Sequence, residues 1–240
     1  MKFWWNETDE NEMGLLLTEL INQLRDDHMS RHTLNLDMLR MYTQRDYDGM
    51  GRVDSSNNVS GEDYRMRMNV IGNITDTLVS RIGKNRPKPM YLTKRGDYKL
   101  RQNAKRLTDV MEGIFYQTGI YDVMPKIFQD SCIFDMACMK IGREGSELFV
   151  ERVFPNEMLW DQNASMYSDM PPSMHQVKSI PLETLILQFP EREEELRYSA
   201  ATDDKMSSEE GHEAEMVECV ESWHLPSTND AEDGRHVIHM

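Results

Sequence analysis

The sequence contains little cysteine and lacks any long apolar run. Its three cysteines, Cys132, Cys138 and Cys219, are odd in number and irregularly spaced, which favours reduced thiols in a cytoplasmic setting over a disulfide framework. Cys132 and Cys138 lie among apolar residues, and we expect both thiols to be buried. No run of about 18 apolar residues occurs, so the sequence predicts no membrane-spanning helix.

The motifs that supply catalysis in many enzymes are also missing. The sequence has no glycine-rich phosphate loop and no GxSxG nucleophile elbow. His28 and His32 have a spacing that can bind zinc, but no third ligand is evident, so we interpret them as part of an exposed helix face. The segment Asp161–Asp169 has the composition of a calcium loop, but it lacks the central glycine, and Pro172 occupies the twelfth position. We therefore expect no catalytic residues, no cofactor and no metal site.

Positive charge is scarce overall but concentrated in one segment. The chain has 27 Lys and Arg against 42 Asp and Glu, which gives a formal net charge of −15. Ten of the 27 basic residues lie between Arg81 and Arg106, where Asp97 is the single acid. The negative balance argues against a protein that coats DNA, because such binding depends on neutralising phosphates.

The basic segment has three candidate explanations: a nucleic-acid surface, a contact with an acidic subunit, or positive charge at helix ends. Arg81 and Lys84 flank Gly83, a predicted helix stop, and positive charge stabilises that end of the helix dipole. The candidate contact residues are Arg81, Lys84, Arg86, Lys88, Lys99, Arg101, Lys105 and Arg106.

The spacing of apolar residues predicts five helices before residue 137. They are expected at residues 10–47 (two helices), from near 60–63 to 83, at 97–118 and at 121–136. A polar, turn-rich loop is expected at 46–61, and Gly119 should end the fourth helix. Pro125 is tolerated in the fifth helix because it falls in the first turn.

The apolar faces of these helices predict a core. Ile71, Ile74 and Leu78 recur at steps of three and four, which places them on one face of the third helix. The residues that we predict to be largely buried are Ile71, Ile74, Leu78, Leu107, Met111, Ile114, Phe128 and Phe134.

From Ala137 onward, the apolar pattern changes to a period near two, which is typical of β-strands. A hairpin is predicted within 137–154, and three later strands are predicted at 175–180, 216–226 and 234–240. A helix at 181–200 should begin at Pro181. The sequence therefore predicts an α+β fold, with a helical N-terminal half followed by a β-hairpin and a small antiparallel sheet.

The block from Asn69 to Asp161 has a distinctive order of elements. A helix ending in RIGKNRPKP is followed by a short strand, the long helix AKRLTDVMEGIFY, the helix FQDSCIFDMACMKIG, and a hairpin closing on ERVFPNEMLWD. This order resembles the N-terminal half of tailed-bacteriophage portal proteins, the head-to-tail connectors. The later segments ESWHLP and DGRHVIHM are similar to the sheet strands that follow in those proteins, so the resemblance covers about 62–240.

The resemblance implies a portal wing-like fold, the outer part of such a subunit. We expect an N-terminal helical arm and mobile loop at 1–60 and a portal wing-like α+β region at 61–240. Because the chain stops within an apolar strand, we expect that region to continue beyond Met240 in a longer protein.

The resemblance also implies a function. The chain would be a structural subunit, and not an enzyme, of a ring, expected to be a dodecamer, through which double-stranded DNA is packaged and ejected. Its partners would be further copies of itself, the capsid protein, the packaging motor (terminase), tail adaptor proteins and the passing DNA, with no membrane. It would be assembled in the host cytoplasm and located in the virion at the capsid vertex that bears the tail.

Within such a ring, the basic segment would face an acidic neighbour. The segment Glu183–Glu221 holds thirteen Asp or Glu against three Lys or Arg, and subunits in a cyclic ring show two different faces to their neighbours. Two alternatives remain: a nucleic-acid-binding module that uses residues 81–106, and a hydrolase of unrecognised type.

Overall fold

The computed structural model describes residues 3–43, 69–94, 96–166, 170–203, 216–228, 231 and 233–240. The chain forms two compact units: unit 1 comprises Met1–Ser30 and Asn156–Met240, and unit 2 comprises Arg31–Pro155. The division at residue 60 that we expected from the sequence stays a prediction.

Unit 1 is built around a four-stranded antiparallel sheet with the strand order β3-β4-β5-β6. Its strands are β3 (Met158–Leu159), β4 (Ser173–Pro181), β5 (Met216–His224) and β6 (Arg235–His239). The last three strands lie where the alternating pattern predicts them. β3 has only two residues, too few for that pattern to reveal it.

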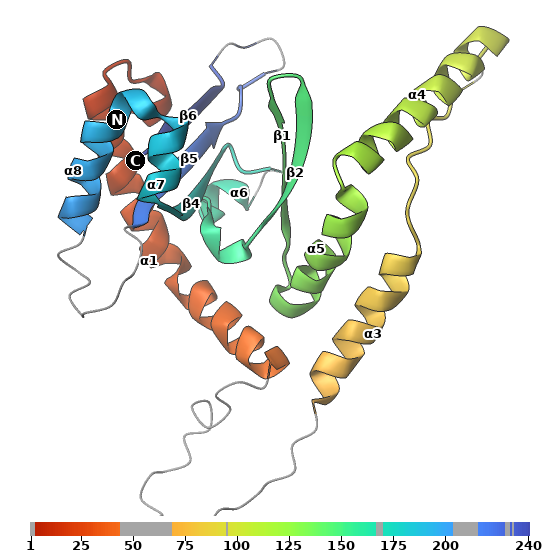
Figure 1. Cartoon of the computed structure of the whole chain (residues 1–240), viewed down its shortest axis with the longest axis horizontal. Coiled ribbons are helices and arrows are strands. Elements are labelled where there is room, and N and C mark those ends of the chain that lie inside the picture. Colours follow the sequence, from red (N-terminus) through yellow and green to blue (C-terminus); the bar gives the residue numbers. More distant parts are fainter. Residues whose placement is uncertain are drawn as a thin grey trace, which may run out of the picture. The chain divides into compact units, whose positions relative to one another are not determined.

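Helical elements of unit 1 cover this sheet and supply its core (Figure 1). They are η1 (Trp4–Asn6), the first part of α1 (Glu10–Thr43), α6 (Gln162–Ser165), α7 (Leu182–Gln188), η3 (Pro190–Arg192) and α8 (Glu193–Asp203). The single helix that we expected at 181–200 is broken at Phe189, because Pro190 has no N–H with which to continue the backbone ladder.

Three clusters of buried apolar side chains hold unit 1 together. Leu182, Leu185 and Leu196 pack α7 and α8 against Val217 and Cys219 of β5. The other two clusters join α1 to the sheet and to the N-terminal segment, and their buried members are Ile21, Leu24, Leu159 and Val220 in one and Trp4, Met13 and Leu17 in the other.

Helix α1 corrects one sequence expectation. It is a single helix of 34 residues, so the prediction of two helices within 10–47 is wrong. The apolar spacing is interrupted between residues 25 and 32, but no glycine or proline occurs between residues 15 and 43 to stop the backbone. The described residues before 137 thus hold four α-helices, while the predicted loop at 46–61 and helix start at 60–63 lie outside the described residues.

Unit 2 contains three further helices and a β-hairpin (Figure 1). They are α3 (Val70–Lys84), α4 (Tyr98–Gln117), α5 (Ile120–Phe134), β1 (Cys138–Glu144) and β2 (Glu147–Val153), and η2 (Pro155–Glu157) follows β2. Gly119 adopts a left-handed conformation (φ 64°) between α4 and α5, as expected for a glycine that ends a helix. The antiparallel pairing of β1 with β2 confirms the predicted hairpin, and the whole confirms the α+β class.

The predicted core of unit 2 is only partly correct. Four of the eight residues are exposed, namely Ile71, Ile74, Leu78 and Leu107. The other four are half-buried, namely Met111, Ile114, Phe128 and Phe134. Helix α3 instead turns its small residues inward: Thr75 is buried, and a Cβ added at Gly83 would stand 3.5 Å from Cγ of Pro125 on α5. Periodicity identifies an apolar face but does not say what covers it.

Candidate subunit or nucleic-acid interface

The first part of the predicted interface lies at the C-terminal end of α3. The helix begins at Val70, where Asn69 accepts a hydrogen bond from the Gly72 N–H at 2.7 Å. Arg81 and Lys84 lie exposed in its last turn, where they complement the negative end of the helix dipole. Neither has an acidic partner among the described residues.

The second part is the segment that joins α3 to α4, which runs alongside α4 (Figure 1). The Tyr91 N–H donates to Oγ1 of Thr108 on α4 at 3.2 Å, and the Tyr121 hydroxyl of α5 donates to the Pro87 carbonyl oxygen at 3.3 Å. No strand includes Met90–Thr93, so the short strand expected there is an unpaired segment. The prolines of this segment prevent it from extending α3.

Two candidate contact residues on this segment, Arg86 and Lys88, already contact side chains of α4 and α5. Lys88 Nζ lies 2.5 Å from Oε1 of Glu112 on α4, and this hydrogen bond raises the pKa of Lys88. The Arg86 guanidinium stands 5.6 Å from the centre of the Tyr121 ring, a distance typical of a cation–π contact. Both side chains therefore attach the segment to α4 and α5.

The third part is α4, whose four candidate residues point in two directions. Lys99, Arg101, Lys105 and Arg106 are all exposed. At 3.6 residues per turn, Lys99 and Arg106 lie within about 20° of each other around the helix, and Arg101 and Lys105 lie roughly 100–160° away from them. A flat partner can therefore contact only one of these pairs at a time.

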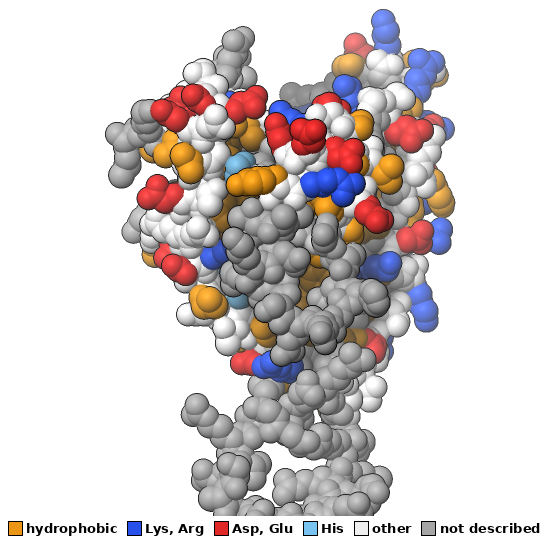
Figure 2. Space-filling model, turned by 60° about the vertical axis from the view of Figure 1, so that its left-hand side comes forward, with side chains coloured by type: hydrophobic (Ala, Val, Ile, Leu, Met, Phe, Trp, Pro, Cys, Tyr) orange, Lys and Arg blue, Asp and Glu red, His pale blue; other side chains and the backbone are white. Residues whose placement is uncertain are grey.

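The surface does not present one continuous positive patch in the view of Figure 2, where Lys and Arg side chains are interspersed with Asp and Glu. The structure brings the eight candidate residues into unit 2 but divides them among α3, the joining segment and α4. Only the α3 pair and the four α4 residues remain available to a partner outside the described residues.

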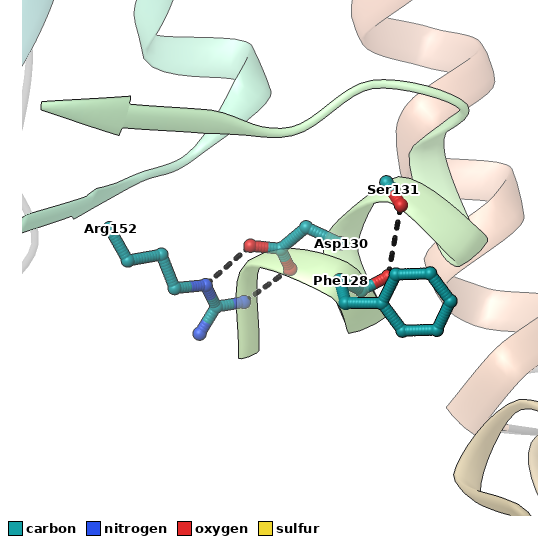
Figure 3. A network of polar contacts seen from close by, with 4 residues as sticks. All are labelled: Phe128, Asp130, Ser131 and Arg152. Atoms are coloured by element: carbon teal, nitrogen blue, oxygen red, sulfur yellow. Dashed lines mark hydrogen bonds and ion pairs between the residues drawn. The ribbon is translucent and has the colours of Figure 1, made fainter. Parts of the chain in front are cut away.

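A polar anchor that the sequence reasoning missed joins α5 to β2 (Figure 3). Arg152 donates from Nε and Nη2 to the two carboxylate oxygens of Asp130, each at 2.5 Å. Asp130 is buried, and its hydrogen bonds raise the pKa of Arg152. The Arg152 guanidinium also stands 4.5 Å from the centre of the Phe154 ring. An aspartate within the apolar stretch KIFQDSCIF was the one sequence signal for this anchor.

The acidic counterpart expected from the sequence is partly described, on η3 and α8 of unit 1. Arg192 and Arg197 pair with Glu10 at 3.8 Å and Glu193 at 2.8 Å, respectively. Three further glutamates are exposed and have no basic partner among the described residues, namely Glu191, Glu194 and Glu195. Residues 204–215 of the acidic segment lie outside the described residues.

The histidine and cysteine expectations need two corrections. His28 is fully buried, with Nε2 2.8 Å from the Trp160 carbonyl oxygen, so the expected exposed face is wrong at this residue. Cys132 is exposed and Cys138 is half-buried, because the end of α5 and the start of β1 are only partly covered. Cys219 is buried, and burial raises its pKa to about 11.

The part of the chain that the structure describes offers neither a metal-binding cluster nor a membrane-spanning helix. No group of three or more His, Cys, Asp or Glu side chains there is placed to hold a metal ion. None of the described helices is long and apolar enough to cross a membrane.

Part of the chain matches the model of a known protein family. Residues 50–233 of the 240 match the family described as phage P22-like portal protein, which is more than half of the chain. The matched region includes α3, α4, α5, the hairpin and strands β3 to β5. No curated protein matches the chain.

Proposed function

The chain belongs to the P22-like phage portal protein family, and we propose that it is a structural subunit of a ring through which double-stranded DNA is packaged and ejected. The family match over residues 50–233 is the observation that carries this proposal. The ring, expected to be a dodecamer, would join the capsid to the tail.

The same proposal assigns the location and the partners. The subunit would be assembled in the host cytoplasm and would reside in the virion, at the capsid vertex that bears the tail. Its partners would be further copies of itself, the capsid protein, the terminase motor and tail adaptor proteins. It would have no enzymatic activity and no cofactor of its own.

The charge of the chain is consistent with a ring that DNA passes without adhering. A formal charge of −15 disfavours tight phosphate binding, because affinity for DNA depends on neutralising its backbone. We propose that the available basic residues on α3 and α4 contact an acidic neighbouring subunit.

Electron microscopy of the purified full-length protein tests the proposal directly. We expect closed rings with a central channel, and phage particles made without this protein should lack packaged DNA. A protein that stays monomeric at every concentration, or phage that package DNA normally without it, would contradict the proposal.

One observation favours a second candidate function, a nucleic-acid-binding module. The four basic residues of α4 are exposed and have no acidic partner among the described residues. Such a module would bind DNA with an affinity that falls steeply as salt rises, since each neutralised phosphate releases a counterion. Weak binding that depends little on salt would exclude it.

A further inference from the structure

We propose that the outer face of α3 packs against a second copy of this chain, on the acidic surface formed by α7, η3 and α8. The outer face of α3 is the set Val70, Asn73, Ile74, Thr77, Leu78 and Arg81. This proposal rests on the proposed ring function and names the two surfaces that would meet within it.

The outer face of α3 is apolar and open. Ile74 and Leu78 are 57% and 45% exposed, although aliphatic residues at this spacing are normally covered. Together with their neighbours they line a shallow, open hollow of about 320 Å³ on the surface of α3. The opposite side of the helix, which carries Thr75, is the one that is buried. An exposed apolar patch bordered by polar residues is typical of a protein contact.

Unit 2 as a whole also lacks its own core within the described residues. All three buried apolar clusters lie in unit 1. In the described part of unit 2, four apolar side chains are buried, namely Ala104, Ile120, Val153 and Pro155. A unit with so little internal burial is typical of a subunit that completes its core by assembly.

Charge identifies the partner surface. The outer face of α3 ends in Arg81, and Lys84 follows in the same last turn; neither has an acidic partner among the described residues. On unit 1, Glu191, Glu194 and Glu195 are exposed and have no basic partner among the described residues. Surfaces of opposite charge attract one another and suppress wrong pairings.

The acidic surface has apolar side chains to match. Leu187 of α7 is 83% exposed, and Tyr198 of α8 is 79% exposed. Glu194 and Glu195 precede Tyr198 by one helical turn, so the carboxylates border the ring on the same side of α8. Each side therefore offers exposed apolar residues together with charge, and the charges that have no partner among the described residues differ in sign between the two sides.

Two different surfaces on one chain favour a ring over a symmetric dimer. Each copy would give α3 to one neighbour and α7–α8 to the other, which is a heterologous contact that can close. A symmetric α3–α3 contact would instead bring together two surfaces of the same charge. Nucleic acid is a poor partner for this face, because the side chains of Val70, Ile74 and Leu78 carry no charge and no hydrogen-bond donor for a phosphate.

Cysteine cross-linking in the full-length protein tests the contact. Leu78→Cys and Tyr198→Cys are made in separate chains, with the exposed Cys132 replaced by serine, and the two are mixed before assembly. A short bis-maleimide should give a covalent dimer in the mixture but not with either variant alone. Leu15→Cys, on an α1 residue that is 74% exposed, is the matched control and should not cross-link to Leu78→Cys.

Each other outcome overturns the inference. A dimer from Leu78→Cys alone would show a symmetric contact. A double variant that cross-links within one chain would show that the same copy covers α3. Rings of normal yield without the mixed cross-link would remove this contact but leave the portal function standing, whereas a wild-type protein that never forms rings would remove both.

Discussion

His224 lies flat against Trp5, with the two ring centroids 4.0 Å apart and the ring planes 7° apart. The neighbouring Trp4 is 2% exposed and approaches the His175 ring edge-on at 5.7 Å. Arg235 of β6 donates to the carbonyl oxygens of Trp5 and Glu7. The N-terminal segment is thus attached to the sheet by stacking, by burial and by hydrogen bonds.

We expect Trp4→Ala to destabilise unit 1 by about 3–5 kcal/mol, because it empties a site enclosed by Met13 and Leu17. Chemical denaturation at neutral pH measures the loss. Phe3→Ala, at the exposed neighbouring position, is the control and should change stability by less than about 1 kcal/mol. Equal effects of the two substitutions would mean that the segment is not docked.

Acidification should destabilise the same sheet. His175 on β4 shares a buried hydrogen bond with Ser222 on β5 at 2.8 Å, and burial lowers its pKa from 6.5 to about 4. As the pH drops from 6.5 towards 4, His175 is protonated in the unfolded chain but stays neutral in the folded chain. The free energy of unfolding therefore falls over this pH range. The difference corresponds to roughly 3 kcal/mol.

Thermal unfolding at a series of pH values checks this expectation. His175→Gln should reduce the fall in thermal stability between pH 6.5 and 4. Some fall will remain, because burial also lowers the pKa values of His224 and His239. Ser179→Ala, at an exposed position on the same strand, should leave the slope unchanged. A wild-type protein equally stable at pH 4 and pH 6.5 would contradict the prediction.

The anchor between α5 and the hairpin should be costly to break. We expect Asp130→Ala to lower the free energy of unfolding by about 2–4 kcal/mol, because Arg152 loses both hydrogen bonds to a buried carboxylate. Because Arg152 is partly accessible to water, the expected loss of stability lies at the lower end of the values typical of a broken buried ion pair.

The matched control for this anchor is an exposed ion pair. Glu193→Ala, which breaks the pair with Arg197 within α8, should cost no more than about 0.5 kcal/mol. Urea denaturation of both variants compares the two. If Asp130→Ala costs no more than Glu193→Ala, then α5 and β2 are held together by packing alone.

Leu78→Ala separates a core role from an interface role. A core leucine would cost about 2–5 kcal/mol, but the exposure of Leu78 predicts a loss below about 1 kcal/mol in the isolated monomer. Denaturation of the dilute monomer gives this value. A loss of 2 kcal/mol or more would place Leu78 in the interior after all.

The sequence predicts the order of elements better than their surroundings. The change of period at Ala137 and the glycine at 119 indicate where the helices end and the hairpin begins, because these signals are local. Burial, in contrast, depends on which distant parts of the chain pack together. Ile71, Ile74 and Leu78 have the spacing of a core face, but α3 buries the side that carries Thr75. The pair of Asp130 and Arg152, 22 residues apart, likewise depends on how the chain folds back.

The same limit applies to the candidate interface. All eight basic residues come from one stretch of sequence, yet Lys88 is engaged by Glu112, which only the path of the joining segment along α4 brings near. Helical spacing alone could have predicted that Lys99 and Arg101 point in different directions. It could not have predicted which direction meets a partner.

The α4 charges give the last prediction. Charges that act together at one interface should matter more than isolated surface pairs, which are worth about 0–1 kcal/mol each. Because Lys99 and Arg106 lie on the side of α4 away from Arg101 and Lys105, we expect one double reversal to glutamate to weaken ring formation. The other double reversal, matched in charge and helix, should leave it unchanged. Ring yield is counted by electron microscopy, with folding checked by circular dichroism.

High salt and compensating substitutions identify the partner of whichever α4 pair supports ring formation. High salt should imitate the reversal in part, because screening shortens the reach of exposed charges to about 8–10 Å or less. A compensating reversal to lysine within 191–195 should restore assembly if those glutamates are the partners. If both double reversals and the fourfold variant form rings at normal yield but lose DNA binding, these residues contact nucleic acid and the subunit contact on α4 is wrong.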